Sequence, residues 1–196
     1  MTPSQPSLFE DAPPGLPEGL AYTPDLITRD EEVGLVARFE ALPFKPYEFR
    51  GYLGNRRTVS FGWRYDHNRM RLDPAQDIPE ILQDLRARCS AFAGLDPQSL
   101  HQALVTEYAP GAGIGWHRDR PEFGEVVGVS FQAPCVFRMR RRQASGWERS
   151  SFTAEPRSAY VLRGAARTEW QHSITPMDRL RYSVTFRNLK ASVSIR

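Results

Sequence analysis

The chain has 196 residues, of which 40% are hydrophobic and 25% are charged, and its formal net charge is +3. This composition is typical of a soluble globular domain, and it excludes a disordered or membrane-spanning chain because no apolar run approaches the length of a span. No signal-peptide pattern opens the sequence, so we expect a cytoplasmic protein without a membrane partner. Cys89 and Cys135 are too few for a disulfide framework and lack metal-ligand spacing, which predicts two reduced thiols.

Residues 1–24 are rich in proline and glycine with little periodicity, which predicts an extended or disordered arm. Within it, Gln5, Leu8 and Phe9 belong to a Gln-Pro-Ser-Leu-Phe segment that resembles the short peptide by which bacterial proteins dock on the replication sliding clamp. The alternative, that Leu8 and Phe9 pack back on the domain, is favoured because so short a motif often arises by chance. Residues 25–196 show no repeat and no second boundary, which predicts one domain.

Two amphipathic helices are predicted in the first half of the chain. The first begins with a capping-box pattern at Thr28 to Glu31 and ends before Pro43. The second covers Pro79 to Ala93, and its Cys89 lies on the apolar face that we expect in the core.

Between these helices, residues 44–71 form short β-prone runs in which aromatic residues alternate with arginines. Such interleaving suits base stacking combined with phosphate pairing. The alternative is an ordinary β-layer with its aromatic residues in the core, and the sequence alone favours that alternative.

From residue 100 onward the pattern changes to about eight short strands with no helix between them. The strands are predicted at Leu100–Tyr108, Ile114–His117, Val126–Phe131, Val136–Arg140, Ser151–Phe152, Ala159–Leu162, His172–Ile174 and Tyr182–Phe186. This succession fits a double-sheet jelly roll, and together with the preceding helices it predicts an α+β chain.

A His-x-Asp pair, His117 and Asp119, follows a glycine-rich turn. Residues i and i+2 of a strand share a face, so this imidazole and carboxylate converge as two of the three ligands of a facial triad. An ordinary His–Asp contact in a solvated turn explains the isolated pair at least as well. His172 is a candidate third ligand, because a jelly roll can return a late strand beside an early one.

The last predicted strand alternates strictly between polar and apolar side chains. Its polar face carries Arg181, Ser183, Thr185 and Arg187. Two arginines that point into a barrel are costly unless each meets an anion, although a solvent-facing strand would satisfy both.

In combination, the His117-x-Asp119 pair, His172 and the Arg181-Tyr-Ser-Val-Thr-Phe-Arg187 ending resemble the AlkB family of Fe(II)/2-oxoglutarate-dependent dioxygenases. The family's typical ending is Arg-Tyr-Asn-hydrophobic-Thr-Phe-Arg. The resemblance implies a double-stranded β-helix, or jelly roll, over about residues 100–188, with N-terminal helices and a nucleotide-recognition lid over about residues 44–71.

The resemblance also implies which residues bind the metal and the co-substrate. The Fe(II) ligands would be His117, Asp119 and His172, with O2 taking an open position. The 2-oxoglutarate residues would be Tyr108, Arg181, Ser183 and Arg187, with Arg181 and Tyr108 at the distal carboxylate and Arg187 near the proximal one. Because Ser183 stands where the family usually has asparagine, we expect altered co-substrate contacts.

The function implied by the resemblance is oxidative dealkylation of N-alkylated bases in DNA or RNA, as in alkylation damage repair. In this reaction O2 and 2-oxoglutarate yield succinate, CO2 and an aldehyde. Two alternatives remain, namely a 2-oxoglutarate oxygenase acting on tRNA modifications or protein, and a non-catalytic reader of modified nucleic acid.

The resemblance predicts the residues that contact the substrate less directly than it predicts the metal ligands. Trp63 and Tyr65 are candidates for stacking on a flipped base, and Arg118 and Arg120 are candidates for binding phosphates. A second basic cluster, Arg138 with residues 140–142, suits phosphates as well, although a solvated loop explains part of it equally.

The base preference is not inherited from the family. Members that strongly repair 1-methyladenine often carry an acidic residue two positions after the iron-binding aspartate. This chain has Pro121 at that position and Glu122 one residue later.

Overall fold

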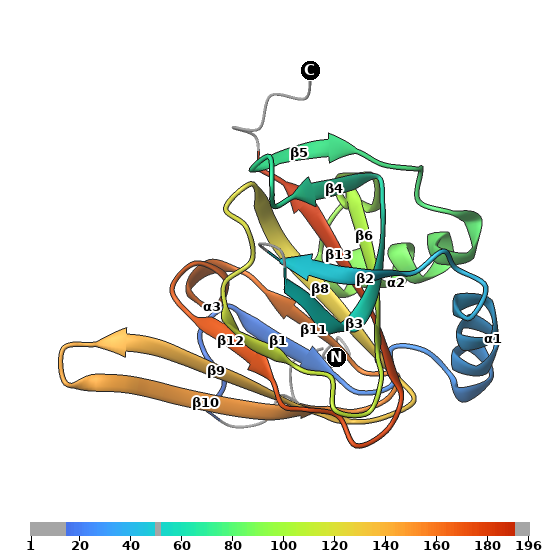
Figure 1. Ribbon diagram of the computed structural model, residues 1–196. Helices are drawn as coiled ribbons and strands as arrows, with labels where there is room; N and C mark the ends of the chain where they lie inside the picture. Colours follow the sequence, from blue (N-terminus) through green and yellow to red (C-terminus); the bar gives the residue numbers. More distant parts are fainter. Residues whose placement is uncertain (1–14, 50–51, 191–196) are drawn as a thin grey trace, which may run out of the picture.

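Two antiparallel sheets form the body of the protein in a computed structural model that describes residues 15–49 and 52–190 (Figure 1). The large sheet has the strand order β1-β11-β8-β13-β6-β3-β2, and the small sheet has the order β10-β9-β12-β7. A separate hairpin consists of β4 and β5. The predicted double-sheet jelly roll is confirmed.

The elements have the following bounds. The strands are β1 (Leu20–Thr23), β2 (Lys45–Phe49), β3 (Tyr52–Phe61), β4 (Trp63–Asp66), β5 (Arg71–Pro74), β6 (Gln102–Tyr108), β7 (Ile114–His117), β8 (Phe123–Phe131), β9 (Cys135–Gln143), β10 (Gly146–Ala154), β11 (Ala159–Leu162), β12 (Gln171–Ile174) and β13 (Arg181–Leu189). The helices are α1 (Arg29–Phe39), α2 (Gln83–Ala93) and α3 (Gly164–Thr168), with 3-10 turns η1 (Glu80–Leu82) and η2 (Pro97–Ser99).

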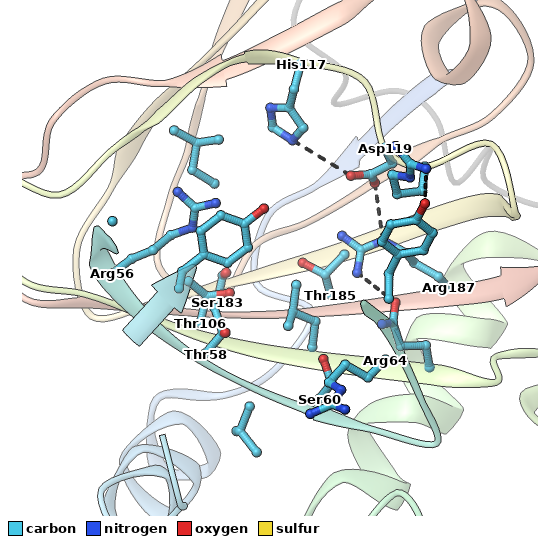
Figure 2. Close-up of a pocket in the computed structure, with 18 of the residues that line it drawn as sticks. Arg56, Thr58, Ser60, Arg64, Thr106, His117, Asp119, Ser183, Thr185 and Arg187 are labelled. Atoms are coloured by element: carbon cyan, nitrogen blue, oxygen red, sulfur yellow. Dashed lines mark hydrogen bonds and ion pairs between the residues drawn. The ribbon is translucent and has the colours of Figure 1, made fainter. Parts of the chain in front are cut away.

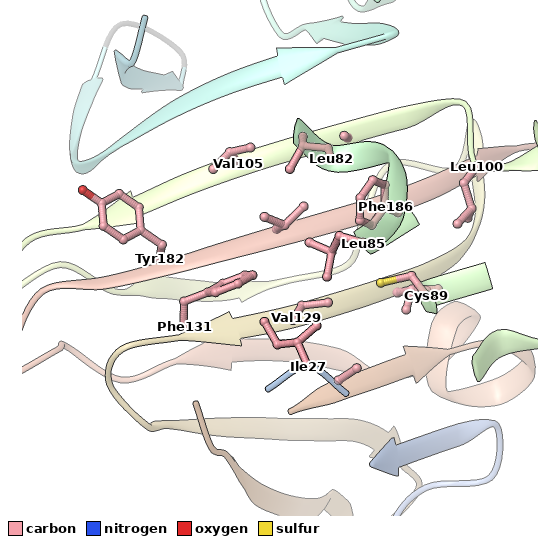
Figure 3. Close-up of a cluster of buried hydrophobic side chains, with 14 of the residues drawn as sticks. Ile27, Leu82, Leu85, Cys89, Leu100, Val105, Val129, Phe131, Tyr182 and Phe186 are labelled. Atoms are coloured by element: carbon pink, nitrogen blue, oxygen red, sulfur yellow. The ribbon is translucent and has the colours of Figure 1, made fainter. Parts of the chain in front are cut away.

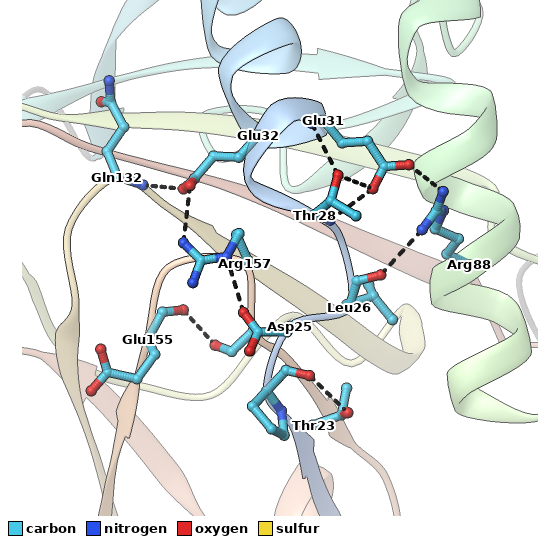
Figure 4. Close-up of polar contacts among 12 residues, drawn as sticks. Thr23, Asp25, Leu26, Thr28, Glu31, Glu32, Arg88, Gln132, Glu155 and Arg157 are labelled. Atoms are coloured by element: carbon cyan, nitrogen blue, oxygen red, sulfur yellow. Dashed lines mark hydrogen bonds and ion pairs between the residues drawn. The ribbon is translucent and has the colours of Figure 1, made fainter.

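The expected capping box starts α1 (Figure 4). The backbone N–H of Glu31 donates to Oγ1 of Thr28 at 3.2 Å, and the backbone N–H of Thr28 donates to the Glu31 carboxylate at 2.7 Å. These bonds satisfy two N–H groups that the helix itself leaves unpaired. The same carboxylate binds Arg88 of α2, so the N-terminus of α1 is attached to the second helix.

The apolar face of the large sheet packs against α2 and η1 (Figure 3). This core contains Leu82, Leu85 and Cys89 from the helical side. Strand β13 contributes Tyr182 and Phe186 from its apolar face. Cys89 is fully buried, as its place in the helical pattern predicts. Burial of the apolar face of β13 directs its polar face toward the space between the two sheets.

A second cluster of buried side chains lies between the sheets. Phe137 of β9 and Tyr160 of β11 meet there with ring centroids 4.8 Å apart. Tyr160 packs against Gly128 of β8, where a Cβ atom would come within 2.3 Å of its ring. Only glycine leaves room for this ring at that position.

The segment expected as an arm contains a strand of the large sheet. Residues 20–23 form β1, which pairs antiparallel with β11 from Leu20↔Leu162 to Thr23↔Ala159. This pairing satisfies backbone groups of β11 that would otherwise lie at an open edge. Gln5, Leu8 and Phe9 lie outside the described residues, so the clamp-docking motif stays a prediction.

One expectation for the second half was wrong, because a short helix does interrupt the strands. Helix α3 lies between β11 and β12 and has five residues, which is too short for an amphipathic period to be detected. The described residues contain no helix with the length and apolar character needed to span a membrane.

Candidate metal and co-substrate site

The pairing of β7 with β12 creates the centre of the site. His117 lies directly opposite His172 in the register, and their ring centroids are 4.2 Å apart. Asp119 follows β7, with its Oδ1 3.8 Å from Nε2 of His117 (Figure 2). Each residue offers one ligand atom, and the three atoms lie within 4.8 Å of one another. This arrangement can hold one divalent metal ion on a single face.

Both imidazoles are held in place by contacts outside the triad. Nδ1 of His117 lies 2.9 Å from the carbonyl oxygen of Gly115. Since a carbonyl only accepts, Nδ1 carries the proton and Nε2 is left with a lone pair for a metal. The His172 ring stacks on Phe137, with centroids 5.2 Å apart and planes at 16°.

Burial and neighbouring charges adjust the protonation of the triad. Burial, together with the positive charge of the neighbouring His117, lowers the pKa of His172 to about 3, and the Asp119 carboxylate offsets only part of this. Burial by itself would raise the pKa of Asp119, but Arg187 and the two histidines more than offset this and hold that pKa well below its usual range. A neutral imidazole and an ionised carboxylate are the forms that bind a metal.

Arg187 and Arg181 occupy opposite ends of the polar face of β13. Arg187 donates from Nε to Oδ2 of Asp119 at 3.2 Å and from a terminal nitrogen to the Gln102 side chain at 3.0 Å. Arg187 is therefore bound to a carboxylate of the triad itself. The structure confirms that both arginines of β13 are buried rather than solvated.

Arg181 fits one carboxylate of a dicarboxylate ligand. Its side chain is 1% exposed, its Nε donates to Oγ of Ser130 at 3.0 Å, and its guanidinium lies 4.8 Å above the centre of the Tyr108 ring. Its buried Nη1 has no hydrogen-bond partner among the described residues. A buried guanidinium that lacks a carboxylate is costly, so this end of the cavity is built to receive an anion.

Three neighbouring strands form the polar floor of the cavity. The registers align Arg56, Tyr108 and Arg181 in one row and Thr58, Thr106 and Ser183 in the next. The cavity has a volume of about 1170 Å³, and both rows and the triad line it. Figure 2 shows most of these side chains around one space, with His117 and Asp119 above the row of Thr58, Thr106 and Ser183.

The candidate substrate residues separate into two groups. Tyr65, Arg118 and Arg120 line the cavity, and Arg120 packs on the Tyr65 ring at 4.0 Å and bonds to its hydroxyl. Trp63 is not among the lining residues, and its backbone carbonyl accepts a hydrogen bond from Gln102 at 3.0 Å. The aromatic residue of β4 at the cavity is therefore Tyr65.

Sequence reasoning missed several cavity residues on β2–β4 and in the turn that follows β4. Tyr47, Arg56, Arg64 and His67 all line the cavity, and the guanidinium of Arg56 lies 3.7 Å above the Tyr47 ring. Strict alternation of Arg56, Thr58 and Ser60 along β3 was the signal that could have identified the cavity face of this strand.

The site combines a His–Asp–His triad between the sheets of a jelly roll with a buried arginine that can bind an anion. This combination defines the class of non-haem iron oxygenases that use an oxo-acid co-substrate. The sequence matches the family model of the 2OG-Fe(II) oxygenase superfamily over residues 26–187, and the chain belongs to that family. Its cofactors are accordingly Fe(II), 2-oxoglutarate and O2, and it is a dioxygenase.

AlkB homologues are among its relatives. The chain is 28% identical over 182 residues to the alkylated DNA repair protein ALKBH8 homolog of Arabidopsis thaliana, which covers 80% of this chain and 50% of the relative. It is 29% identical over 186 residues to the uncharacterized protein L905 of Acanthamoeba polyphaga mimivirus, with 87% and 85% covered. It is 25% identical to the tRNA (carboxymethyluridine(34)-5-O)-methyltransferase alkbh8 of Xenopus tropicalis, of which it spans 26%.

Solved structures share the fold. The structure of OsALKBH1 superposes with a TM-score of 0.65 at 18% identity, covering 88% of this chain and 98% of that one. A Pseudomonas putida prolyl-4-hydroxylase gives a TM-score of 0.62 at 17% identity, with 88% and 94% covered. At these identities the likeness concerns the jelly roll alone, because one fold serves many substrates.

Proposed function

We propose that the chain is a nucleic-acid dealkylase that removes N-linked alkyl groups from bases in DNA or RNA. The observation that carries this proposal is the composition of the cavity wall contributed by β2–β4. Tyr47, Tyr65 and Arg56 bring flat aromatic and cationic groups to the space beside the triad. Such groups stack on bases and pair with phosphates, and they suit a flipped nucleotide better than a peptide chain.

His117, Asp119 and His172 would hold Fe(II), which together with 2-oxoglutarate and O2 supplies the oxidant that hydroxylates the alkyl carbon. One oxygen atom of O2 is incorporated into that carbon and the other into succinate, while 2-oxoglutarate loses CO2. The C–N bond of the hydroxylated group then breaks, and its electron pair stays on the base nitrogen. The carbon leaves as an aldehyde, and the proton of its hydroxyl group is released.

Arg181 would bind the distal carboxylate of 2-oxoglutarate, with the Tyr108 hydroxyl beside it. The Thr106 and Ser183 hydroxyls form the next row of the floor and would donate to the same co-substrate. Arg187 would keep Asp119 ionised and oriented, which leaves the cavity wall of β2–β4 to position the base.

Tyr65 and Arg120 would contact the nucleotide at the entrance, and Arg118 would contact a flanking phosphate. The guanidinium of Arg120 is already stacked on the Tyr65 ring, so the pair presents one flat surface with a positive edge.

The names of relatives support the same class of substrate. One is an alkylated DNA repair protein homolog, and another is named for carboxymethyluridine of tRNA. A modified tRNA uridine is therefore the second candidate substrate.

The experiment incubates the protein with Fe(II), ascorbate and 2-oxoglutarate. Matched DNA and RNA oligonucleotides carry 1-methyladenine, 3-methylcytosine or an etheno lesion, and a tRNA anticodon stem-loop carries a modified uridine. Loss of the alkyl mass with stoichiometric succinate is expected, and His117→Ala abolishes both. Succinate formation without a mass change in any oligonucleotide would refute the nucleic-acid proposal while leaving the oxygenase intact.

A further inference from the structure

The hairpin of β9 and β10 extends beyond the rest of the molecule (Figure 1). Alternation along β9 places Arg138, Arg140 and Arg142 on the face of the small sheet that points away from the cavity. The opposite face of the same strand carries Phe137 and Met139, which belong to the core between the sheets.

These three arginines interleave with two tryptophans, Trp147 of the adjacent strand β10 and Trp116 of β7, which lies beyond β12. The guanidinium of Arg140 lies 4.4 Å from the ring centre of Trp116 and 4.2 Å from that of Trp147. Arg138 lies 5.2 Å from Trp116, and Arg142 lies 5.5 Å from Trp147. The resulting stack, which we term the Arg–Trp ladder, holds each guanidinium against an aromatic face and so restricts its rotamers.

Neutral side chains of β12 orient the ladder further. Nε of Arg138 donates to Oγ of Ser173 at 3.1 Å, and Nε of Arg140 donates to Oε1 of Gln171 at 2.8 Å. Each bond uses one N–H of a guanidinium that has five. Among the residues that the structure describes, the side-chain bonds of Arg138 and Arg140 use only Nε, which leaves their terminal nitrogens for a ligand.

The positive charge of the ladder is not neutralised within the described part of the chain. None of Arg138, Arg140, Arg142 and the neighbouring exposed Arg149 forms an ion pair there, whereas Arg141 on the opposite face is paired with two glutamates. The strand residues that share the outer face with the ladder are tryptophan, serine, threonine, glutamine and valine, without a carboxylate. An anionic partner is the charge complement of such a face.

The ladder is continuous with the cavity. Trp116 belongs to β7, the edge strand of the small sheet, and it lines the cavity next to His117. A chain that leaves the cavity over the β7 edge therefore reaches Trp116 first and then the arginines of β9. Alternate residues of a strand are about 6.8 Å apart, a repeat comparable with that of successive phosphates in an extended strand.

We propose that the Arg–Trp ladder binds the sugar–phosphate backbone of the nucleic-acid strand that flanks the base in the cavity. The inference rests on the proposed function and extends it, since it assigns the outer face of the small sheet to sequence-independent binding. The tryptophan faces are covered by guanidinium groups, so the ladder offers N–H donors for phosphates and little surface for bases.

The test compares two double variants with the same change of charge. Arg142→Gln/Arg149→Gln removes two exposed arginines from the outer face, and Arg29→Gln/Arg38→Gln removes two exposed arginines from α1. Fluorescence anisotropy measures binding of an unmodified single strand of about 15 nucleotides and of a trinucleotide over a range of salt concentrations.

For the long strand, we expect the Arg142→Gln/Arg149→Gln variant, which we call the ladder variant, to bind several-fold more weakly. Its plot of log affinity against log salt should be shallower by about 1.4, which corresponds to two lost phosphate contacts. The trinucleotide, which reaches only the cavity, and the α1 variant should show wild-type slopes. Comparison of thermal unfolding midpoints verifies that both variants are folded.

Equal slopes for the two double variants, or no binding of the long strand by the wild type, would overturn the inference. Polyglutamate that competes as well as the oligonucleotide would assign the face to an acidic protein partner and overturn it too. Ladder-dependent binding without dealkylation would refute only the proposed function, because the anisotropy measurement requires neither iron nor co-substrate.

Discussion

Arg187 and Asp119 are joined by a 3.2 Å hydrogen bond from Nε to Oδ2, while Oδ1 of the same carboxylate faces His117. The two side chains come from positions 68 residues apart and are both about 10% exposed. One oxygen of the carboxylate is thus fixed by an arginine, so the other is presented to the metal position in a single orientation.

Replacement of this arginine should weaken metal binding. We expect Arg187→Gln to reduce affinity for Fe(II), or for Mn(II) as a substitute, about 10- to 100-fold, because Asp119 loses its orienting partner. Titration of the metal into the anaerobic protein measures the effect. Arg57→Gln, which removes an arginine paired with Glu107 outside the triad, is the control and should leave the affinity unchanged. Equal affinities for Arg187→Gln and wild type would contradict the prediction.

Replacement of Arg181 should leave the stability of the free protein intact but weaken the binding of 2-oxoglutarate. Arg181→Met removes a buried charge that lacks a carboxylate, so the unfolding midpoint without co-substrate should not fall. The increase in that midpoint on addition of 2-oxoglutarate should disappear, with affinity about 10- to 100-fold weaker from the loss of charged hydrogen bonds. Arg181→Lys, which keeps the charge but not the planar fork, should be intermediate. A full 2-oxoglutarate shift in Arg181→Met would show that the anion binds elsewhere.

The Glu107 carboxylate should make stability depend on pH. Two hydrogen bonds from Arg57, each 2.7 Å, lower its pKa below the ordinary value of 4.5 despite partial burial, and the Tyr182 hydroxyl adds a third. Because the folded pKa is depressed, this stabilisation is present above the unfolded pKa and is lost as pH falls through the folded pKa. Glu107→Gln should therefore lower the free energy of unfolding by about 1 kcal/mol near neutral pH, with allowance for the exposed Arg57.

Urea unfolding at a series of pH values measures this difference. The gap between wild type and Glu107→Gln should narrow as pH falls from the unfolded pKa of 4.5 and close below the depressed folded pKa, where the wild-type carboxyl is protonated in both states. A gap that stays constant with pH would mean that packing, and not charge, accounts for the effect.

A methyl group at position 128 should disturb the centre of the jelly roll. Gly128→Ala places Cβ within 2.3 Å of the Tyr160 ring, and that ring packs on Phe137, the residue that stacks on His172. We expect a loss of about 1–3 kcal/mol in the free energy of unfolding, as is typical of overpacking. Gly115→Ala is a matched control, because nothing lies within 4 Å of the added atom. A Gly128→Ala protein as stable as this control would show that Tyr160 can move freely.

Local sequence patterns predicted much of the fold because they reflect short-range physics. The capping box at Thr28 and the alternation of β13 each depend on a few neighbouring residues, and both are present in the structure. Helix α3 was missed because five residues carry no measurable periodicity, and β1 was missed because its partner β11 lies far away in the sequence.

The metal residues could be predicted because their chemistry restricts the choice of side chains. Two histidines and an aspartate in this order, with arginines on the last strand, resemble the motifs of a known oxygenase family, and that resemblance implied the anionic co-substrate. The cavity wall could not be predicted in the same way. Whether Trp63 or Tyr65 faces the cavity depends on how the β4–β5 hairpin is placed against the large sheet, and several placements satisfy the same sequence.

By itself, the sequence determined the class of reaction, because His117, Asp119, His172 and the Arg181–Arg187 ending together resemble the motifs of a known oxygenase family. Only the tertiary structure decided that Arg187 holds the metal-facing aspartate, that Arg56 joins Tyr108 and Arg181 in one row, and that Trp116 connects the cavity to the Arg–Trp ladder. These contacts join strands that are distant in sequence, and their register is set by burial of whole sheet faces, which no local pattern encodes.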